Sequence, residues 1–454
     1  MKYELSPLIS VQGKKYLNDM LQSASAPVFN HQAGDRIESG DLLSLNKFGQ
    51  DLNMSKPMSK PSEKLMEQIE AWRRSVPLYK KSLKKFKDLN SDWQSIPTIS
   101  RREIAEHPEL LVPDDQELKR LIVYRTAGTT GHPLLVPHHP QAAASYQILI
   151  EEALRRCAIY PKFEAGRVAC FLIGAQKKTV TYPCILSVWN GAGFAKLNIN
   201  PEDWREAKHR AQYFKEFEPE ILTGDPLSFA ALSELDLDIR PKALISTAVA
   251  MSASLKVKLE KRFSAPVIDW YSLTETGPIG FVKPNEEQYS ILPHDLFVEV
   301  LDETGQQSGE NEIGEIVVSG GRNPFVPLIR YRTGDFGMRV GDQLCELEGR
   351  KPVQFRSIKK HLINTVDIAR VLREYPIIQH FFKQRADHSC EVVIHPFDSA
   401  FGSFNVKRLN EELSELFGGA KIDIRLDRDL SAACPGEKII PYLSEVSDGT
   451  QFEE

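Results

Sequence analysis

The feature that most constrains the fold is an alternation of apolar runs and helical segments between residues 142 and 270. Residues 168–173 form an uninterrupted apolar run, which is typical of a strand buried on both faces. We expect helices over 142–158 and around Leu255, Leu259 and Phe263. The further strands that we expect are 221–223, 243–246 and 267–270. Strands that alternate with helices predict βαβ units and a parallel sheet.

The pattern changes in the last third of the chain. Residues 297–301 and 315–319 flank a polar loop, which indicates an antiparallel, barrel-like region. Beyond Gly349-Arg350 the segments predict a smaller α+β unit. A chain of 454 residues also exceeds one ordinary core. We therefore predict an α/β protein with a large domain over 1–349 and a small, mobile α+β domain over 350–454.

Five further expectations come from short local patterns. Residues 46–60 are polar and interrupted by prolines, so we expect a loop there. Leu65, Ile69 and Trp72 fall at helical spacing. Ser100 and Glu103 have the spacing of a capping box, which predicts the start of a short helix. The apolar residues from Trp204 to Phe217 predict one face of another helix, and residues 421–426 predict a half-buried strand.

Charge and cysteine usage exclude several classes of protein. The net charge of −5 gives no basic stripe for nucleic acid. The six cysteines contain no C-x-x-C pair, so they indicate neither a zinc ribbon nor a disulfide framework. The first residues lack a signal-like apolar core, and no run approaches 18 apolar residues. We therefore expect a cytoplasmic protein that has no membrane or nucleic-acid partner.

A segment rich in glycine and threonine lies between two short apolar runs, which predicts a loop between two strands. Residues 124–133 read Tyr-Arg-Thr-Ala-Gly-Thr-Thr-Gly-His-Pro. Gly128 and Gly131 allow a tight turn, and successive backbone N–H groups in such a turn form an anion nest. The hydroxyl groups of Thr126, Thr129 and Thr130 add donors for phosphate oxygens. No Gly-Lys-Ser/Thr closes the loop, so it is not a P-loop. Taken alone, it is equally well explained as a hairpin turn.

Four later segments accompany this loop. They are Tyr271-Ser-Leu-Thr-Glu-Thr-Gly-Pro278, Gly314-Glu-Ile-Val-Val318, Leu328-Ile-Arg-Tyr-Arg-Thr-Gly-Asp335 and Leu347-Glu-Gly-Arg350. In this order and at these separations they resemble the adenylate-forming superfamily of acyl-CoA synthetases. The segment 327–335, and the earlier run from Val76-Pro77 to Ile104, resemble the phenylacetate–CoA ligase branch. The resemblance covers roughly residues 64–440.

This resemblance implies an enzyme that activates a carboxylic acid with ATP and Mg²⁺. The acid, which we expect to be aromatic or compact, would form an acyl-adenylate with release of pyrophosphate and then pass to coenzyme A. Two anions must meet in the first step, so positioning and positive potential supply most of the catalysis. The resemblance also allows a homodimer.

The resemblance assigns a role to each matching residue. Residues Thr126, Gly128, Thr129, Thr130 and Gly131 would bind the β- and γ-phosphates. Thr274 would contact the α-phosphate, and Glu275 would bind Mg²⁺, which prefers carboxylate oxygen. Tyr271 and the turn that contains Thr247 and Ala248 would line adenine. Asp335 would accept hydrogen bonds from the ribose hydroxyls, and Arg350 would bridge ribose and phosphate. Lys438, near the chain end, would reach the α-phosphate and the carboxylate.

Several positions depart from the family pattern. Ala127 and His132 stand where the loop usually has a hydroxyl residue and a lysine, and Val249 replaces a glutamate of the adenine turn. After Arg350 the chain reads Lys351-Pro352 instead of an acidic hinge, and proline restricts the backbone there. These departures bear mainly on the thiol-transfer step.

Two alternatives to transfer to coenzyme A therefore stay open. The chain could adenylate an acid and transfer it to an amine or a carrier-protein thiol. It could also be a catalytically silent relative that binds a nucleotide or acyl ligand. The presence of Glu275, Asp335 and Arg350 disfavours the silent relative. Two histidines after the loop, His138 and His139, could face an acyl pocket, but polar loop residues are the commoner explanation.

Overall fold

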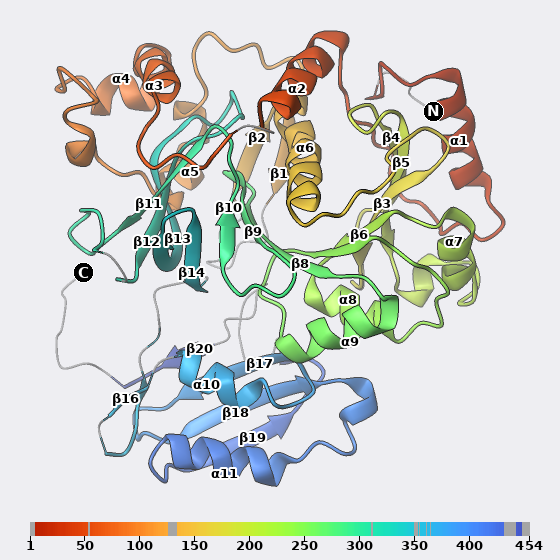
Figure 1. The fold of residues 1–454 in the computed structure, drawn as a ribbon, viewed down its shortest axis with the longest axis vertical. Helices are drawn as coiled ribbons and strands as arrows, with labels where there is room; N and C mark the ends of the chain where they lie inside the picture. Colours follow the sequence, from red (N-terminus) through yellow and green to blue (C-terminus); the bar gives the residue numbers. More distant parts are fainter. Residues whose placement is uncertain are drawn as a thin grey trace. The chain divides into compact units, whose positions relative to one another are not determined.

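The structure is a computed structural model, and its described residues fall into two compact units (Figure 1). The described residues are 5–52, 55–125, 134–309, 312–348, 353, 355–359, 361–363, 365–430 and 442–446. The first unit comprises the described residues up to 249 and residues 263–348, and the second comprises residues 250–262 and the described residues from 353 onward. Each unit is considered by itself. The predicted division at residue 350 stays a prediction.

The first unit contains eight of the described helices and most of the described strands. Its helices are α1 (Val11–Gln22), α2 (Ser39–Leu52), α3 (Glu63–Ser75), α4 (Pro77–Ser82), α5 (Arg101–Glu106), α6 (Pro140–Arg156), α7 (His209–Phe217) and α8 (Pro226–Ser233). Its strands are β1 (Ile122–Arg125), β2 (Leu135–His138), β3 (Val168–Gly174), β4 (Tyr182–Leu186), β5 (Ala192–Asn198), β6 (Ile221–Gly224), β7 (Ala243–Ser246), β8 (Val267–Leu273), β9 (Gly277–Val282), β10 (Tyr289–Ile291), β11 (Leu296–Leu301), β12 (Gly314–Gly320), β13 (Leu328–Val340) and β14 (Gln343–Glu348).

One twelve-stranded sheet organises this unit, in the order β11-β12-β13-β14-β10-β9-β8-β7-β6-β3-β5-β4. Strands β5, β3, β6, β7 and β8 are parallel, as the alternation of strands and helices predicts. From β8 onward the neighbouring strands pair antiparallel, so the antiparallel strands predicted after residue 290 extend the same sheet. The predicted α/β class is therefore confirmed.

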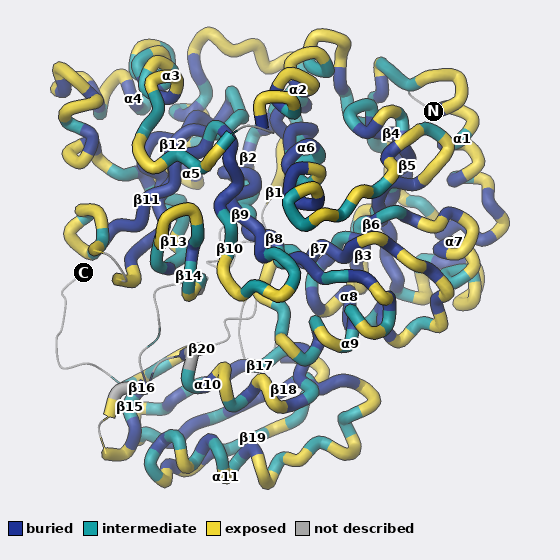
Figure 2. The backbone as a smooth tube through the Cα atoms, in the orientation of Figure 1, coloured by how far each residue is buried: buried dark blue, intermediate teal, exposed yellow. Residues whose placement is uncertain are grey.

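Helix α2 corrects the expectation of a loop for residues 46–52, whereas residues 55–60 lie outside helices and strands, as expected. The helix continues to Leu52, because Leu45, Phe48 and Leu52 form an apolar stripe that is buried in one core with α6 and the parallel strands. A helix gains most of its stability from burying such a stripe. The polar residues that suggested a loop lie on the other side of the helix, which Figure 2 shows as exposed.

Both faces of the parallel strands are covered. On β3, Cys170 belongs to the core that contains α6. Its neighbour Phe171 has its ring 5.7 Å from the ring of Tyr213 on α7, and the two rings are stacked. Helix α7 begins at His209, so the prediction that Trp204 belongs to this helix was wrong. Instead, the indole N–H of Trp204 donates to the backbone oxygen of Asn198 at 2.7 Å, and this bond places the side chain in the core independently of a helix.

The antiparallel strands share a second core with α3, α4 and α5. Leu65 and Ile69 on α3 are buried there, and the partly buried Trp72 packs against them, so the helix predicted from their spacing is confirmed. Helix α5 begins at the predicted capping box of Ser100 and Glu103. The residue before this box, Ile99, exchanges two backbone hydrogen bonds with β13: its N–H donates to the oxygen of Arg330, and its oxygen accepts from the N–H of Arg332. These bonds fix α5 beside β13.

The second unit is a small α+β structure. It contains α9 (Ala253–Phe263), of which residues up to 262 belong to it, α10 (Thr365–Leu372) and α11 (Val406–Leu416). Its strands are β15 (Phe355–Arg356), β16 (Leu362–Ile363), β17 (Ile377–Gln384), β18 (Cys390–Pro396), β19 (Ile422–Leu426) and β20 (Tyr442–Ser444), and four of them form a sheet in the order β19-β18-β17-β20. The half-buried strand predicted at residues 421–426 is present as β19. In the part of the chain that the structure describes, none of the helices combines the length and apolar character needed to cross a bilayer.

Candidate active site

The turn between β8 and β9 carries two of the predicted site residues, Thr274 and Glu275. The turn is short because Gly277 adopts a φ of +74°, which L side chains rarely adopt. A Cβ at this glycine would lie 2.8 Å from the ring of Tyr146 on α6. Glycine therefore lets the turn pack directly on α6, and this contact fixes the position of the turn.

Glu275 is held by two groups from other elements. Its side chain is only 4% exposed. The hydroxyl of Tyr331 on β13 donates to its Oε1 at 2.5 Å, and a guanidinium nitrogen of Arg101 on α5 lies 3.8 Å from the same oxygen. Burial, and next the charge of Glu275, raise the pKa of Tyr331 well above its usual range. Tyr331 therefore stays a neutral donor at physiological pH, and Glu275 is presented in one fixed orientation.

A second pair joins the two residues predicted to bind the nucleoside. The hydroxyl of Tyr271, at the end of β8, donates to Oδ2 of Asp335 on β13 at 2.8 Å. Thr333 supports the aspartate, because its hydroxyl accepts from the backbone N–H of Asp335 at 3.1 Å and donates to the oxygen of Ile316 at 2.7 Å. Burial is the main cause that raises the pKa of Tyr271 well above its usual range. The structure thus places Tyr271 beside Asp335 and holds both.

His138 ties the strand that follows the Gly/Thr loop to the turn that carries Glu275. Its Nε2–H donates to the backbone oxygen of Thr274 at 2.9 Å. The side chain is 1% exposed, and burial lowers its pKa to about 4, so the imidazole is neutral. His139 caps α6 by accepting from the N–H of Gln141 at 3.2 Å. Both histidines have structural roles. The expectation of polar loop residues was wrong for His138, which is buried at the end of β2, whereas His139 lies in the connection between β2 and α6.

Thr247 and Ala248 form a tight turn directly after β7. The N–H of Thr247 donates to the oxygen of Gly224, and its own oxygen accepts from the N–H of Val249 at 3.0 Å. Ala248 has a φ of +76°, a strained value for a residue with a Cβ. The carboxyl ends of parallel strands meet at one edge of a sheet, where α/β proteins bind ligands. This turn and Tyr271 lie at that edge, and their role in lining adenine stays a prediction.

The remaining predicted site residues lie outside the described residues. They are Thr126, Gly128, Thr129, Thr130, Gly131, Arg350 and Lys438. The strands β1 and β2 that flank the Gly/Thr loop are described and pair antiparallel, from Ile122 opposite His138 to Arg125 opposite Leu135. The prediction of a loop between two strands is therefore confirmed for its flanks, and the roles assigned within the loop stay predictions.

Sequence reasoning missed three residues of this site. Tyr331 belongs to the same motif as Asp335, and this shared motif was the available signal. Arg101 approaches Glu275 only because Ile99 pairs with β13, which local sequence does not reveal. Tyr146 lies on α6, and only its close approach to Gly277 identifies it as part of the site.

Comparisons with known proteins give one family match and one curated relative. Residues 52–323 match the AMP-binding enzyme family. Protein CapK of Staphylococcus aureus is 24% identical over 242 residues, which are 48% of this chain and 51% of CapK. The chain thus spans about half the length of the curated relative it matches.

Two solved structures share the fold at low sequence identity. One is 2-hydroxyisobutyryl-CoA ligase in the postadenylation state with 2-HIB-AMP, with a TM-score of 0.62, 13% identity and coverage of 84% of this chain and 88% of that one. The other is the anthranilate CoA ligase AuaEII with anthranoyl-AMP, with a TM-score of 0.50, 13% identity and 97% coverage of both chains. The family match covers more than half of the sequence, and the fold agrees with it. The chain therefore belongs to the AMP-binding enzyme family.

Proposed function

We propose that this chain uses ATP to activate a carboxylic acid and then transfers the acyl group to coenzyme A. The observation that carries the proposal is the arrangement of Glu275, on the turn after β8, and of the Tyr271–Asp335 pair, which joins β8 to β13. A carboxylate suited to a cation is held by Tyr331 of β13, and an aromatic–carboxylate pair suited to a nucleoside joins β8 to the same strand. The family match and the acyl-AMP ligands of the two similar structures support this assignment.

The bonds formed and broken in the two half-reactions show which groups the site must bring together. In the first, a carboxylate oxygen bonds to the α-phosphorus of ATP while the bond to pyrophosphate breaks. In the second, the sulfur of coenzyme A bonds to the acyl carbon, the bond to AMP breaks, and the thiol proton passes to solvent. Each half-reaction brings anionic groups together, so fixed positive and hydrogen-bonding groups contribute most of the rate enhancement.

Glu275 is the residue that would hold Mg²⁺. Magnesium in nucleotide sites usually takes one or two protein carboxylates and completes its shell with phosphate oxygens and water. The site fits this pattern, since Glu275 is a single buried carboxylate and the described residues contain no cluster of three metal-binding side chains. When bound, the ion would offset the negative charge of the triphosphate. Tyr331 and Arg101 orient the carboxylate for this task.

The nucleoside would bind across Tyr271 and Asp335. Because the Tyr271 hydroxyl is occupied by Asp335, its ring is fixed and can offer a face to adenine, with the turn at Thr247 and Ala248 alongside. Asp335 would accept from the ribose hydroxyls, and Thr274 would donate to the α-phosphate. The Gly/Thr loop, Arg350 and Lys438 complete the proposed site in the roles that the family resemblance gives them.

A compact acid, as in the phenylacetate–CoA ligase branch, is the finer part of the proposal. A cavity beside Glu275 lies between α6 and the β8–β9 turn, and Tyr146 and Thr276 are among its lining residues. Its volume is about 10 Å³, room for roughly one water molecule. An acyl group could bind there only if Tyr146 moved, so the preference for a compact acid rests on the family resemblance and not on this cavity.

A screen of carboxylic acids tests the proposal. Each acid is assayed for exchange of labelled pyrophosphate into ATP, and then for thioester formation with coenzyme A. We expect at least one compact acid to support both activities. Exchange of pyrophosphate without thioester formation would favour an amine or a carrier-protein thiol as the acyl acceptor. ATP binding without exchange for any acid would reject adenylation.

A further inference from the structure

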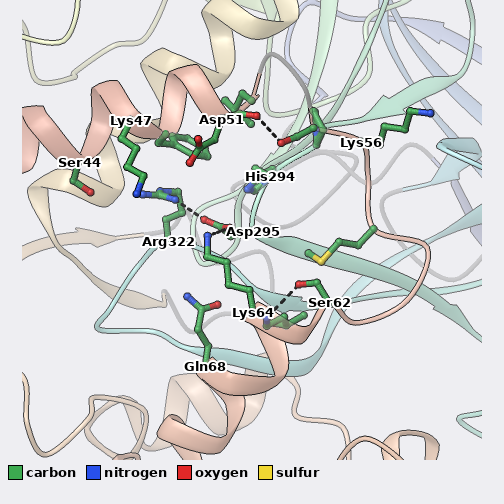
Figure 3. A pocket seen from close by; sticks show the side chains of 16 residues that line it. Ser44, Lys47, Asp51, Lys56, Ser62, Lys64, Gln68, His294, Asp295 and Arg322 are labelled. Carbon is green, nitrogen blue, oxygen red and sulfur yellow. Dashed lines mark hydrogen bonds and ion pairs between the residues drawn. The ribbon is translucent and has the colours of Figure 1, made fainter.

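A second pocket lies in the first unit between α2, the start of α3 and the segment before β11 (Figure 3). Its volume is about 430 Å³, which is within the range of small-molecule sites. None of the residues assigned to ATP lines it. Two of its lining residues, His294 and Arg322, also line the small cavity beside Glu275, so the pocket adjoins the candidate active site.

Arg322 is held rigidly at the wall of this pocket. It follows β12 through Gly320, whose φ is +105° and whose Cβ would lie 2.3 Å from the backbone oxygen of Asp295. Its guanidinium forms an ion pair with Asp295 and lies 3.9 Å from the ring centroid of Phe48 on α2. Its Nε is buried without a hydrogen-bond partner in the described part of the chain. A buried donor of this kind costs free energy unless a ligand or water satisfies it.

His294 supplies a buried acceptor in the same wall. Its Nε2–H donates to the backbone oxygen of Pro278 at 2.8 Å, so Nδ1 carries the lone pair. Burial lowers the pKa of His294 to about 4, and the side chain is 9% exposed. Among the described residues Nδ1 has no partner. A neutral imidazole nitrogen accepts a hydrogen bond, so the matching ligand group is a hydroxyl.

The charged side chains of the pocket favour an anion. Four cationic residues line it, and they are Lys47, Lys56, Lys64 and Arg322. The acidic lining residues are Asp51 and Asp295, which leaves a net charge of +2. Lys64 lies 2.8 Å from Asp295. In Figure 3 the Lys47 side chain extends toward the guanidinium of Arg322, whereas Lys56 extends away from the other cations.

Two like charges directed at one space repel unless an anion lies between them. A phosphate monoester offers three strong acceptor oxygens, so it can contact Lys47 and Arg322 together more readily than a carboxylate, which has two. We propose that this pocket binds a small phosphate monoester that also carries a hydroxyl group. The phosphate lies between Lys47 and Arg322, and the hydroxyl donates to Nδ1 of His294. This site is separate from the proposed ATP site.

Glycerol 3-phosphate is a suitable probe, with methyl phosphate as the matched compound without a hydroxyl. Binding to the full-length chain is measured by calorimetry. Because other sites could also bind phosphate, acetylation of individual lysines is followed by mass spectrometry at increasing probe concentration. Lys60 is the control, since it is exposed and does not line the pocket. The variants are Lys47→Ala and the matched Lys60→Ala.

We expect the probe to protect Lys47 from acetylation and to leave Lys60 unprotected. Lys47→Ala should weaken binding about threefold to tenfold, the range for a partly exposed charge contact, while Lys60→Ala should bind as the native chain does. Glycerol 3-phosphate should bind more tightly than methyl phosphate. Unchanged acetylation of Lys47 at saturation, or equal affinities in both variants, would overturn the site. Equal binding of the two probes would overturn the role of His294.

Discussion

Replacing Tyr331 with phenylalanine removes one atom from the contact that orients Glu275. The tyrosine is fully buried, and its hydroxyl donates to Oε1 of Glu275 at 2.5 Å. Phenylalanine has nearly the same shape, so packing around the ring is preserved. What changes is a hydrogen bond to a carboxylate that is only 4% exposed.

The expected cost follows from the burial of both partners. Hydrogen bonds to charged groups contribute roughly 1.5–3 kcal/mol, and a buried acceptor that loses its donor incurs most of its desolvation penalty. Arg101, at 3.8 Å, offsets part of this loss. We therefore expect Tyr331→Phe to lower the free energy of unfolding by about 2 kcal/mol. Exchange of pyrophosphate into ATP should fall about tenfold or more, because Glu275 loses its fixed orientation.

Urea unfolding and pyrophosphate exchange measure these two effects. The matched control is Tyr375→Phe in the second unit, where the tyrosine hydroxyl donates to Oε2 of Glu412 at 2.8 Å. Glu412 is 33% exposed, so we expect a smaller loss of stability and unchanged exchange. Native stability and exchange in Tyr331→Phe would refute the reasoning, and so would an equal loss of exchange in both variants.

Three further predictions concern the turn, the nucleoside pair and the buried histidine. Gly277→Ala should lower the free energy of unfolding by at least about 2 kcal/mol, because a positive φ and a Cβ 2.8 Å from Tyr146 are both unfavourable; a urea midpoint equal to that of the native chain would contradict this. Tyr271→Phe should raise the KM for ATP roughly tenfold by releasing Asp335, and an unchanged KM would argue against the nucleoside role. For His138, burial lowers the pKa of the folded state to about 4, whereas the unfolded chain takes up the proton near 6.5. The free energy of unfolding should therefore fall as the pH decreases from about 6.5 to about 4, by up to roughly 3 kcal/mol. Urea titrations across this range measure the slope, and His138→Gln should reduce it.

The local sequence pattern predicted correctly those elements whose stability depends on residues close together in the sequence. The apolar run at 168–173 predicted a fully buried strand, and β3 is buried on both faces. The capping box at Ser100 and Glu103 correctly placed the start of α5. In both cases the stabilising interaction is either within a few residues or depends only on the apolar character of the segment.

Where the local pattern gave a wrong or incomplete prediction, tertiary contacts determine the structure. Helix α2 extends through residues that look like a loop, since burial of Phe48 and Leu52 outweighs their polar neighbours. Trp204 is buried without belonging to α7, because a single hydrogen bond to the backbone holds it. At the candidate site, the approach of Arg101 to Glu275 depends on the pairing of Ile99 with β13. Contacts between residues this far apart in the sequence have no local signature.

A crystal structure of the full chain with ATP and Mg²⁺ tests the central claim most directly. We predict that the metal binds Glu275, that adenine lies against Tyr271, and that the ribose hydroxyls donate to Asp335. A nucleotide bound at another place, with Glu275 still held by Tyr331 and contacting neither metal nor phosphate, would contradict the account.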